Sequence, residues 1–117
     1  MAAATKTIHD AGDLVWVEFG PPVGHEQAGR RPALVVSLQR YNAGSTVLLV
    51  CPVTRSPRPW PFKVPIHTAQ GITGFVIADQ VQAIDPAVRV IRRAGRAPDA
   101  ILAEVRAKLV ALIGGVT

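Results

Sequence analysis

Short apolar runs separated by turn residues make up most of the chain between residues 12 and 97. Their alternation of apolar and polar positions and their β-branched residues are typical of strands. In the first run, Trp16 is expected on one face of a strand, with Val15, Val17 and Phe19 on the other. We expect strands at 14–19, 33–37, 46–52, 74–79, 81–84 and 89–91, and a further strand carries the alternating Phe62, Val64 and Ile66.

Clusters of glycine and proline mark the connections between these strands. Residues 20–24, GPPVG, open a loop after the first strand, and residues 42–44, NAG, predict a turn before the third. Residues 55–61, RSPRPWP, hold three prolines and must form a loop. The run at 46–52 is continuously apolar, which predicts a strand buried on both faces, with Cys51 buried inside it.

The C-terminal part of the chain has a different period. After Pro98 and Asp99, which favour a helix start, the apolar positions fall at helical spacing until Gly114 and Gly115. These positions are Ile101, Leu102, Val105, Leu109, Leu112 and Ile113. The whole pattern predicts an α+β fold, in which a strongly bent sheet or small half-open barrel is closed by a C-terminal helix.

Length and charge limit the possibilities further. A chain of 117 residues fits one domain, and we expect a flexible tail over 1–11 and a single domain over 12–117. The excess of 13 Lys and Arg over 8 Asp and Glu, mostly arginine, indicates an acidic partner or simply a basic surface. The chain has a single cysteine, a polar N-terminus and no apolar run long enough to span a membrane. These features predict a soluble cytoplasmic protein.

The loop at 25–32 is the first candidate for function. It crowds polar and charged residues between two strands, where functional side chains often lie. His25, Glu26, Gln27, Arg30 and Arg31 are its candidates. The alternative is a solvated loop in which Glu26 pairs with one of the two arginines.

Three further candidates follow the later strands. Thr54 comes after the buried run, although it could be an ordinary strand-terminal threonine. Arg55, Arg58 and Trp60 combine positive charge with an aromatic ring, which suits single-stranded nucleic acid, although the tryptophan could instead plug the end of the barrel. Asp79 and Gln80 lie between two strands and could form a hydrogen-bonded turn.

Other chemistries find no matching pattern in the sequence. The chain has no paired-cysteine or paired-histidine spacing, no GxSxG and no P-loop lysine motif. His9, His25 and His67 are scattered. We therefore expect no metal site and no cofactor.

Four segments in order resemble the MazF/PemK family of toxins. GDLVWVEF at 12–19 and GHEQAGRRPALVVS at 24–37 resemble the opening signature of that family. CPVT at 51–54 resembles its P-x-T segment, ADQV at 78–81 its [AC]-D-Q segment, and KLVALIGG its last helix. The resemblance covers residues 12–115.

The resemblance implies an SH3-like or CcdB-like barrel, a homodimer, and a ribonuclease that is neutralised by an acidic antitoxin. It implies that Arg31 and Thr54 are catalytic, with His25 and Asp79 matching residues that Kid-like members use. The Kid-like subgroup has an arginine two residues before that aspartate, where this chain has Ile77, so the Arg31 and Thr54 assignment is favoured.

The chemistry of RNA suggests how such a site would act without a metal. The 2′-hydroxyl can attack the adjacent phosphate and leave a 2′,3′-cyclic phosphate and a 5′-hydroxyl. Arg31 would stabilise the developing charge and Thr54 would donate a hydrogen bond. His25, Glu26 or Asp79 would be the base. Glu26 and Gln27 would otherwise position the substrate, and Arg30, Arg55, Arg58, Trp60 and Gln80 would bind RNA.

Three alternatives remain from the sequence alone. The first is a gyrase poison of the CcdB kind, which shares the fold. The second is a plain nucleic-acid-binding barrel. The third is a degenerate toxin homologue that has become an interaction module, an interpretation that Ile77 keeps open.

Overall fold

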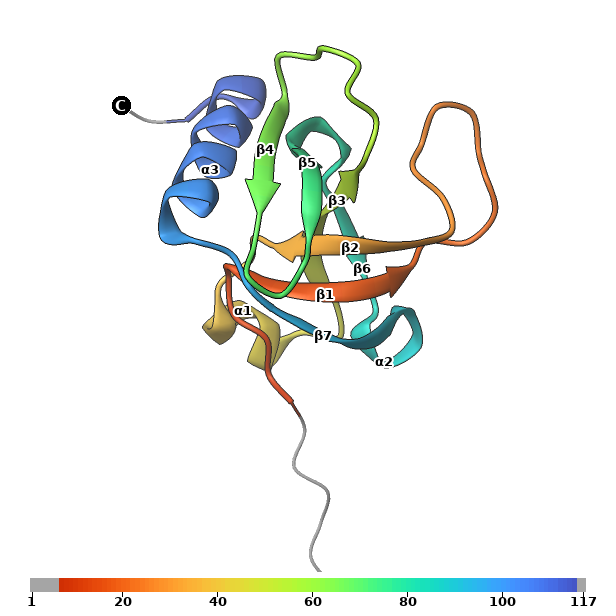
Figure 1. Ribbon diagram of the computed structural model, residues 1–117. Coiled ribbons are helices and arrows are strands. Elements are labelled where there is room, and N and C mark those ends of the chain that lie inside the picture. Colours follow the sequence, from red (N-terminus) through yellow and green to blue (C-terminus); the bar gives the residue numbers. More distant parts are fainter. Residues whose placement is uncertain (1–6, 116–117) are drawn as a thin grey trace, which may run out of the picture.

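Seven strands form one antiparallel sheet in the computed structural model, which describes residues 7–115 (Figure 1). The strand order is β4-β5-β3-β2-β1-β7, and β6 pairs with β3 beside β5. The strands are β1 (Asp13–Glu18), β2 (Arg30–Val35), β3 (Leu48–Thr54), β4 (Lys63–His67), β5 (Thr73–Ile77), β6 (Gln82–Ile84) and β7 (Val90–Arg96).

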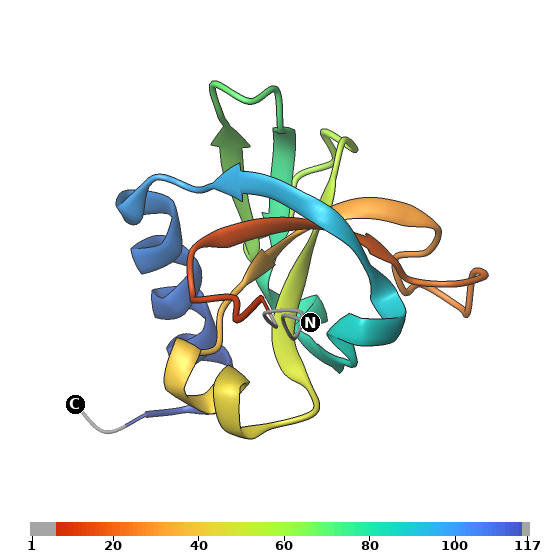
Figure 2. The ribbon, with the colours of Figure 1, turned by 90° about the horizontal axis from the view of Figure 1, so that it is seen from below.

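Four short or medium helical segments complete the fold. They are α1 (Gln39–Gly44), the 3-10 turn η1 (Ala78–Gln80), α2 (Pro86–Arg89) and α3 (Asp99–Ile113). The C-terminal helix α3 packs against η1 and β4, on the side of the molecule away from the β1–β2 loop (Figures 1 and 2).

The two faces of the sheet carry separate apolar clusters, as strand alternation requires. The first cluster includes Leu14, Leu34 and Val53 and is covered by Leu102 and Val105 of α3. The second cluster contains Val15, Val17, Ala33, Val35, Leu48, Val50 and Ile84. Trp16 packs against the first cluster and its neighbours Val15 and Val17 belong to the second, which confirms the predicted facing of this strand.

β3 determines where the sheet changes partner. One edge of β3 pairs with β2. Its other edge pairs with β6 at Leu48–Val50 and with β5 at Val53 and Thr54. The turn η1 connects β5 to β6, so it lies beside the middle of β3. Pro52 is located there, and it has no amide proton to donate to a neighbouring strand.

The predicted α+β class, the bent sheet and the C-terminal helix are confirmed. The sheet is open, however, because β4 and β7, the first and last strands of the order, do not pair with each other in the part of the chain that the structure describes. The buried run is confirmed in part: Cys51 is fully buried, but β3 covers Leu48–Thr54 rather than 46–52, Thr46 is exposed and Leu49 is 36% exposed. The end of the predicted apolar stripe of α3 is exposed at Leu112 and Ile113.

Two helices were not predicted. The turn expected at 42–44 is the end of α1, which is held because the buried Asn42 donates to the carbonyl oxygens of His9 (2.8 Å) and Ser37 (3.1 Å). A helix of six residues is too short to show a clear helical period of apolar residues in the sequence, and this helix is fixed by a distant partner. α2 begins with a stronger signal, an Asp85 N-cap followed by Pro86.

Some boundaries also differ from the expected ones. The strand expected at 74–79 ends at Ile77, and Asp79 lies in η1. The strand expected at 89–91 extends over Val90–Arg96. Residues 1–6 of the expected tail lie outside the described residues, whereas His9 and Ala11 are buried against the domain, where Asp13 accepts from the Asp10 amide at 2.9 Å.

Gly74 allows a close approach between β5 and the end of β3. A Cβ at this position would lie 2.3 Å from the carbonyl oxygen of Thr54, and φ is +150°. We expect Gly74→Ala to lower the free energy of unfolding by about 2–3 kcal/mol, because backbone atoms must separate. The matched control is Gly44→Ala, where a Cβ meets nothing within 4 Å and the cost should be near zero. Denaturant unfolding measures both, and equal stabilities would contradict the prediction.

Candidate functional site

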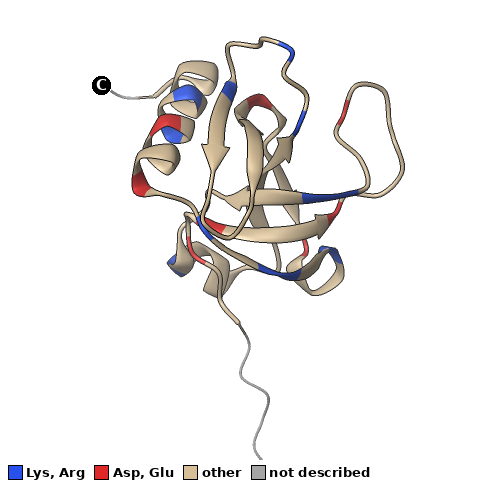
Figure 3. Cartoon of the chain, viewed as in Figure 1, with Lys and Arg blue, Asp and Glu red and all other residues tan. Residues whose placement is uncertain are grey.

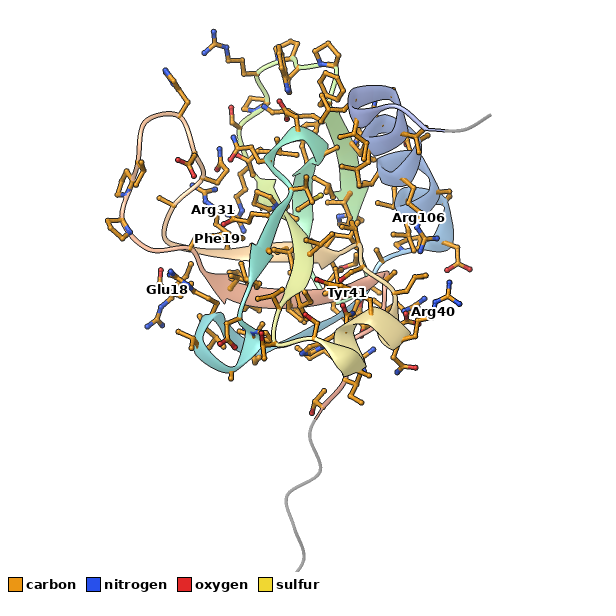
Figure 4. The ribbon with its side chains drawn as sticks, turned by 180° about the vertical axis from the view of Figure 1, so that it is seen from behind. Glu18, Phe19, Arg31, Arg40, Tyr41 and Arg106 are labelled. Atoms are coloured by element: carbon orange, nitrogen blue, oxygen red, sulfur yellow. The ribbon has the colours of Figure 1, made fainter. Side chains whose placement is uncertain are left out.

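The β1–β2 loop is closed at its base by backbone hydrogen bonds. The Phe19 amide donates to Gly29 (2.9 Å) and the Gly29 amide donates to Gly20 (2.8 Å). Gly29 has a φ of +71°, which other residues rarely adopt. Arg31 lies at this base (Figure 4), where its Nε donates to the carbonyl oxygen of Ala28 at 2.7 Å. The loop conformation therefore fixes the orientation of the Arg31 guanidinium.

Gln80 fastens the same loop to η1. Its Oε1 accepts from the Gln27 amide at 2.8 Å, and its Nε2 donates to the His25 carbonyl at 3.3 Å. A single side-chain amide thus joins segments that are more than 50 residues apart in the sequence. The expected turn at Asp79 and Gln80 is present as η1, and its side chains also bind neighbouring loops.

The β3–β4 loop is held from two sides. The Lys63 ammonium donates to the carbonyls of Ser56 (3.0 Å) and Arg58 (2.6 Å). The Trp60 indole donates to Oδ2 of Asp79 at 3.0 Å. Trp60 is 50% exposed, so it does not plug the end of the sheet, as one sequence interpretation allowed.

These loops and η1 enclose a hollow of about 460 Å³, here called the Thr54 hollow. Thr54 lies at its floor, 5% exposed, and its Oγ1 accepts from the Ser56 amide at 3.2 Å. The lining residues are His25, Gln27, Thr54, Ser56, Arg58, Pro59, Trp60, Lys63, Ile77, Asp79 and Gln80.

A second hollow of about 300 Å³, the Trp16 hollow, adjoins the ends of β2 and β3. Ala33 pairs with Pro52, so continuing this register by two residues places Arg31 opposite Thr54. The lining residues are Trp16, Arg30, Arg31, Pro32, Val53, Arg55, Gly71, Ile72 and Thr73. Basic positions mark the start of β2 and the β3–β4 loop in Figure 3.

The predicted site residues are therefore divided between two adjoining hollows. Glu26 lines neither hollow, and it does not pair with an arginine. Arg30 instead pairs with Glu18, with Nε 3.3 Å from Oε1. Sequence reasoning missed Ser56, Lys63 and Trp16 as lining residues, although Lys63 alternates with the apolar residues of β4 and so had a readable signal.

Two buried groups lie in or beside η1. Oδ1 of Asp79 is buried with no hydrogen-bond partner among the described residues. Burial, and then the charge of Asp79, raises the pKa of the Cys51 thiol to about 12. The thiol therefore stays protonated near neutral pH and is a poor nucleophile.

Metal-binding clusters and membrane-spanning helices are both absent from residues 7–115. In this part of the chain, no three His, Cys, Asp or Glu side chains come together in a way that could hold a metal ion. Among its helices, none has the length and apolar character needed to cross a membrane.

The chain is similar to known proteins over most of its length. Residues 10–113 match the family described as PemK-like, MazF-like toxin of type II toxin-antitoxin system. The chain is 37% identical to the endoribonuclease toxin MazF of Escherichia coli K12 over 94% of its length and 98% of that protein. It is 40% identical to the endoribonuclease toxin ChpB of the same strain, over 92% and 97%.

Solved structures give the same result. MazF from Deinococcus radiodurans matches with a TM-score of 0.84 and 41% identity, covering 94% of this chain and 100% of that one. MazE–MazF from the same organism matches with a TM-score of 0.82 and 42% identity, covering 95% and 100%.

The role of Gln80 as a fastener can be tested by exchange. We expect Gln80→Ala to speed hydrogen exchange of the Gln27 amide about tenfold, because two hydrogen bonds worth roughly 0.5–1.5 kcal/mol each are lost. Gln82→Ala is the matched control, since Gln82 joins β6 through its backbone. Hydrogen exchange of the β1–β2 loop is the measurement, and equal rates in both variants would refute the role.

Proposed function

The chain belongs to the PemK-like, MazF-like toxins of type II toxin–antitoxin systems, and we propose that its two adjoining hollows are the RNA-cleaving site. The chain is a toxin endoribonuclease of such a system. The main support is the pairing of β2 with β3, which brings the strand ends that carry Arg31 and Thr54 side by side. Arg31 lines the Trp16 hollow and Thr54 lines the Thr54 hollow.

Arg31 and Thr54 are the proposed catalytic residues. The Nε of Arg31 donates to the carbonyl oxygen of Ala28, and the two terminal nitrogens form a planar pair of further donors. A planar pair fits the non-bridging oxygens of a phosphate, where negative charge increases during cleavage. The Thr54 hydroxyl adds one donor to the same phosphate.

The substrate provides the attacking group in this proposal. The ribose 2′-hydroxyl attacks the adjacent phosphorus, the bond from phosphorus to the 5′-oxygen breaks, and a 2′,3′-cyclic phosphate and a 5′-hydroxyl result. The positive charge of Arg31 supplies the stabilisation that a metal ion would otherwise give, so the reaction is metal-independent.

His25 is the proposed base. Its side chain is exposed and lines the Thr54 hollow, and histidine is the residue that most often transfers protons in enzymes. Asp79 is less accessible, because Oδ1 is buried and Oδ2 accepts from Trp60, so we assign it to positioning Trp60. Glu26 lies outside both hollows.

Substrate binding is assigned to the surrounding polar and aromatic groups. Arg58 and Trp60 of the β3–β4 loop would hold RNA at the Thr54 hollow, and Gln27 and Gln80 shape its wall. Arg30 and Arg55 would take phosphates that continue past Arg31. Single-stranded RNA suits this arrangement because unpaired bases are free to stack.

The partner of this toxin is a cognate antitoxin, as the MazE–MazF structures of a relative indicate. The charge of +5 favours an acidic segment that competes with RNA for the same arginines.

We further propose a cytoplasmic homodimer, in which a second copy covers exposed apolar residues such as Leu112 and Ile113. A monomer in light scattering that cleaves normally would exclude the dimer.

The identity of the nucleophile can be tested with one ribose. After mapping the cut on a long RNA, we expect cleavage of an oligonucleotide that is DNA except for the ribose on the 5′ side of the cut. The reaction should proceed in excess EDTA and give a 2′,3′-cyclic phosphate and a 5′-hydroxyl that a kinase labels directly. All-DNA is the control. Cleavage after 2′-O-methylation of that ribose, or a downstream 5′-phosphate, would overturn the mechanism.

The two catalytic residues can be tested with near-isosteric changes. We expect Thr54→Val and Arg31→Lys each to lower the cleavage rate about 10²–10³-fold, since each removes donors to the charged phosphate. Thr54→Ser keeps the hydroxyl and should keep most of the rate. Single-turnover cleavage is the measurement, with thermal unfolding as a check on folding. Wild-type rates for Thr54→Val would remove Thr54 from the site.

A further inference from the structure

The Trp16 hollow is lined by Arg31 and by several residues that the proposed reaction does not use. Its apolar wall is built by Trp16, Pro32, Val53 and Ile72, and Trp16 is only partly buried. The wall thus combines an aromatic ring with small apolar side chains beside an opening to solvent. A flat apolar ligand can lie there against the indole ring.

Positive charge surrounds this apolar wall. Arg30 and Arg55 line the hollow, and both are exposed. Arg92 of β7 lies over the Trp16 ring, with Cζ 5.5 Å from its centroid, and holds the ring from outside the hollow. Of Arg30, Arg55 and Arg92, only Arg30 has an acidic partner among residues 7–115, namely Glu18. Both side chains of this pair are well exposed, so water and salt screen it.

The chain connects this hollow directly to the catalytic residues. Arg30 precedes Arg31 on β2, and Arg55 follows Thr54 at the end of β3. Arg31 itself lines the Trp16 hollow together with Arg30 and Arg55, whereas Thr54 lines the Thr54 hollow. A strand of RNA that passes the ends of β2 and β3 therefore meets both hollows in turn.

We propose that the Trp16 hollow binds one base of the RNA outside the cleaved step, stacked on Trp16, with its flanking phosphates on Arg30 and Arg55. An apolar aromatic platform between guanidinium groups is what an unpaired nucleotide requires, because the base loses water and the phosphates keep their charge. This subsite rests on the proposed function, since it extends the RNA path past the cut. In this proposal Trp16 binds RNA, and substrates must be long enough to reach Trp16 to gain its contact.

Tryptophan fluorescence can report on this subsite without any cleavage. The chain has two tryptophans, so Trp60→Phe leaves Trp16 as the sole emitter. The probe is a random-sequence RNA decamer with 2′-O-methyl groups throughout, which the proposed mechanism cannot cut. We expect saturable quenching of Trp16, because a stacked base quenches indole emission. An abasic oligomer of equal length carries the phosphates alone and should bind without quenching.

Variants of the same protein assign the contacts. Arg30→Gln and Arg55→Gln should each weaken binding of the decamer severalfold. The matched control is Arg106→Gln on α3, which lies on the opposite side of the molecule from Arg31 (Figure 4) and should change nothing. In the wild-type background, Trp16→Leu should weaken binding about tenfold and Trp16→Phe much less.

The outcomes separate the subsite from the reaction. Decamer binding without quenching, or no binding, in a protein that still cleaves long RNA would overturn the subsite and leave the ribonuclease intact. Quenching in a protein that cleaves no RNA would support the subsite and reject the proposed ribonuclease activity. Quenching by an acidic peptide rich in glutamate, but not by the decamer, would overturn the RNA assignment in favour of a protein ligand.

Discussion

The interruption in the ladder along β3 is the constraint on which the rest of the site depends. β5 and β6 both pair with the same edge of β3, and the three residues of η1 must connect them beside Pro52. This forces Asp79 and Gln80 out of the ladder, where their side chains are free to bind other segments. An uninterrupted strand would instead send alternate residues to opposite faces and could not place both side chains at one hollow.

Each loop of the site is also tied to η1 by one side chain of that turn. Gln80 holds the β1–β2 loop and Asp79 holds Trp60 of the β3–β4 loop. Loops are usually the least stable parts of a fold, and catalysis needs its groups held within a fraction of an ångström. The arrangement meets this need with few contacts, because the anchors stand on a turn that packs against both β3 and α3. Far from the site, Asp13 ties β1 to β7 through Arg93 and Arg96, each at 3.2 Å.

The sequence predicted the elements better than the connections between them. Alternation and helical spacing are local properties, so β1, the buried β3 and α3 could be found from the chain alone. The candidate residues were also found, because polar residues crowd into loops between strands. Their division into two hollows could not be predicted, since it depends on how the β1–β2 and β3–β4 loops are tied to η1. The same is true of α1, whose buried Asn42 depends on the distant His9 carbonyl.

The geometry of Arg31 shows how these levels connect. Its Nε is bound to the carbonyl of Ala28, which belongs to the loop that Gln80 fastens to η1. An arginine held at Nε presents its terminal nitrogens in one direction, so less rotamer freedom is lost when a phosphate binds. A lysine at this position could keep the charge but would lose both the anchor and the direction. The fold therefore orients the positive charge of the proposed site in three steps. The interrupted pairing of β3 positions η1, Gln80 of η1 holds the β1–β2 loop, and Ala28 of that loop fixes the guanidinium of Arg31.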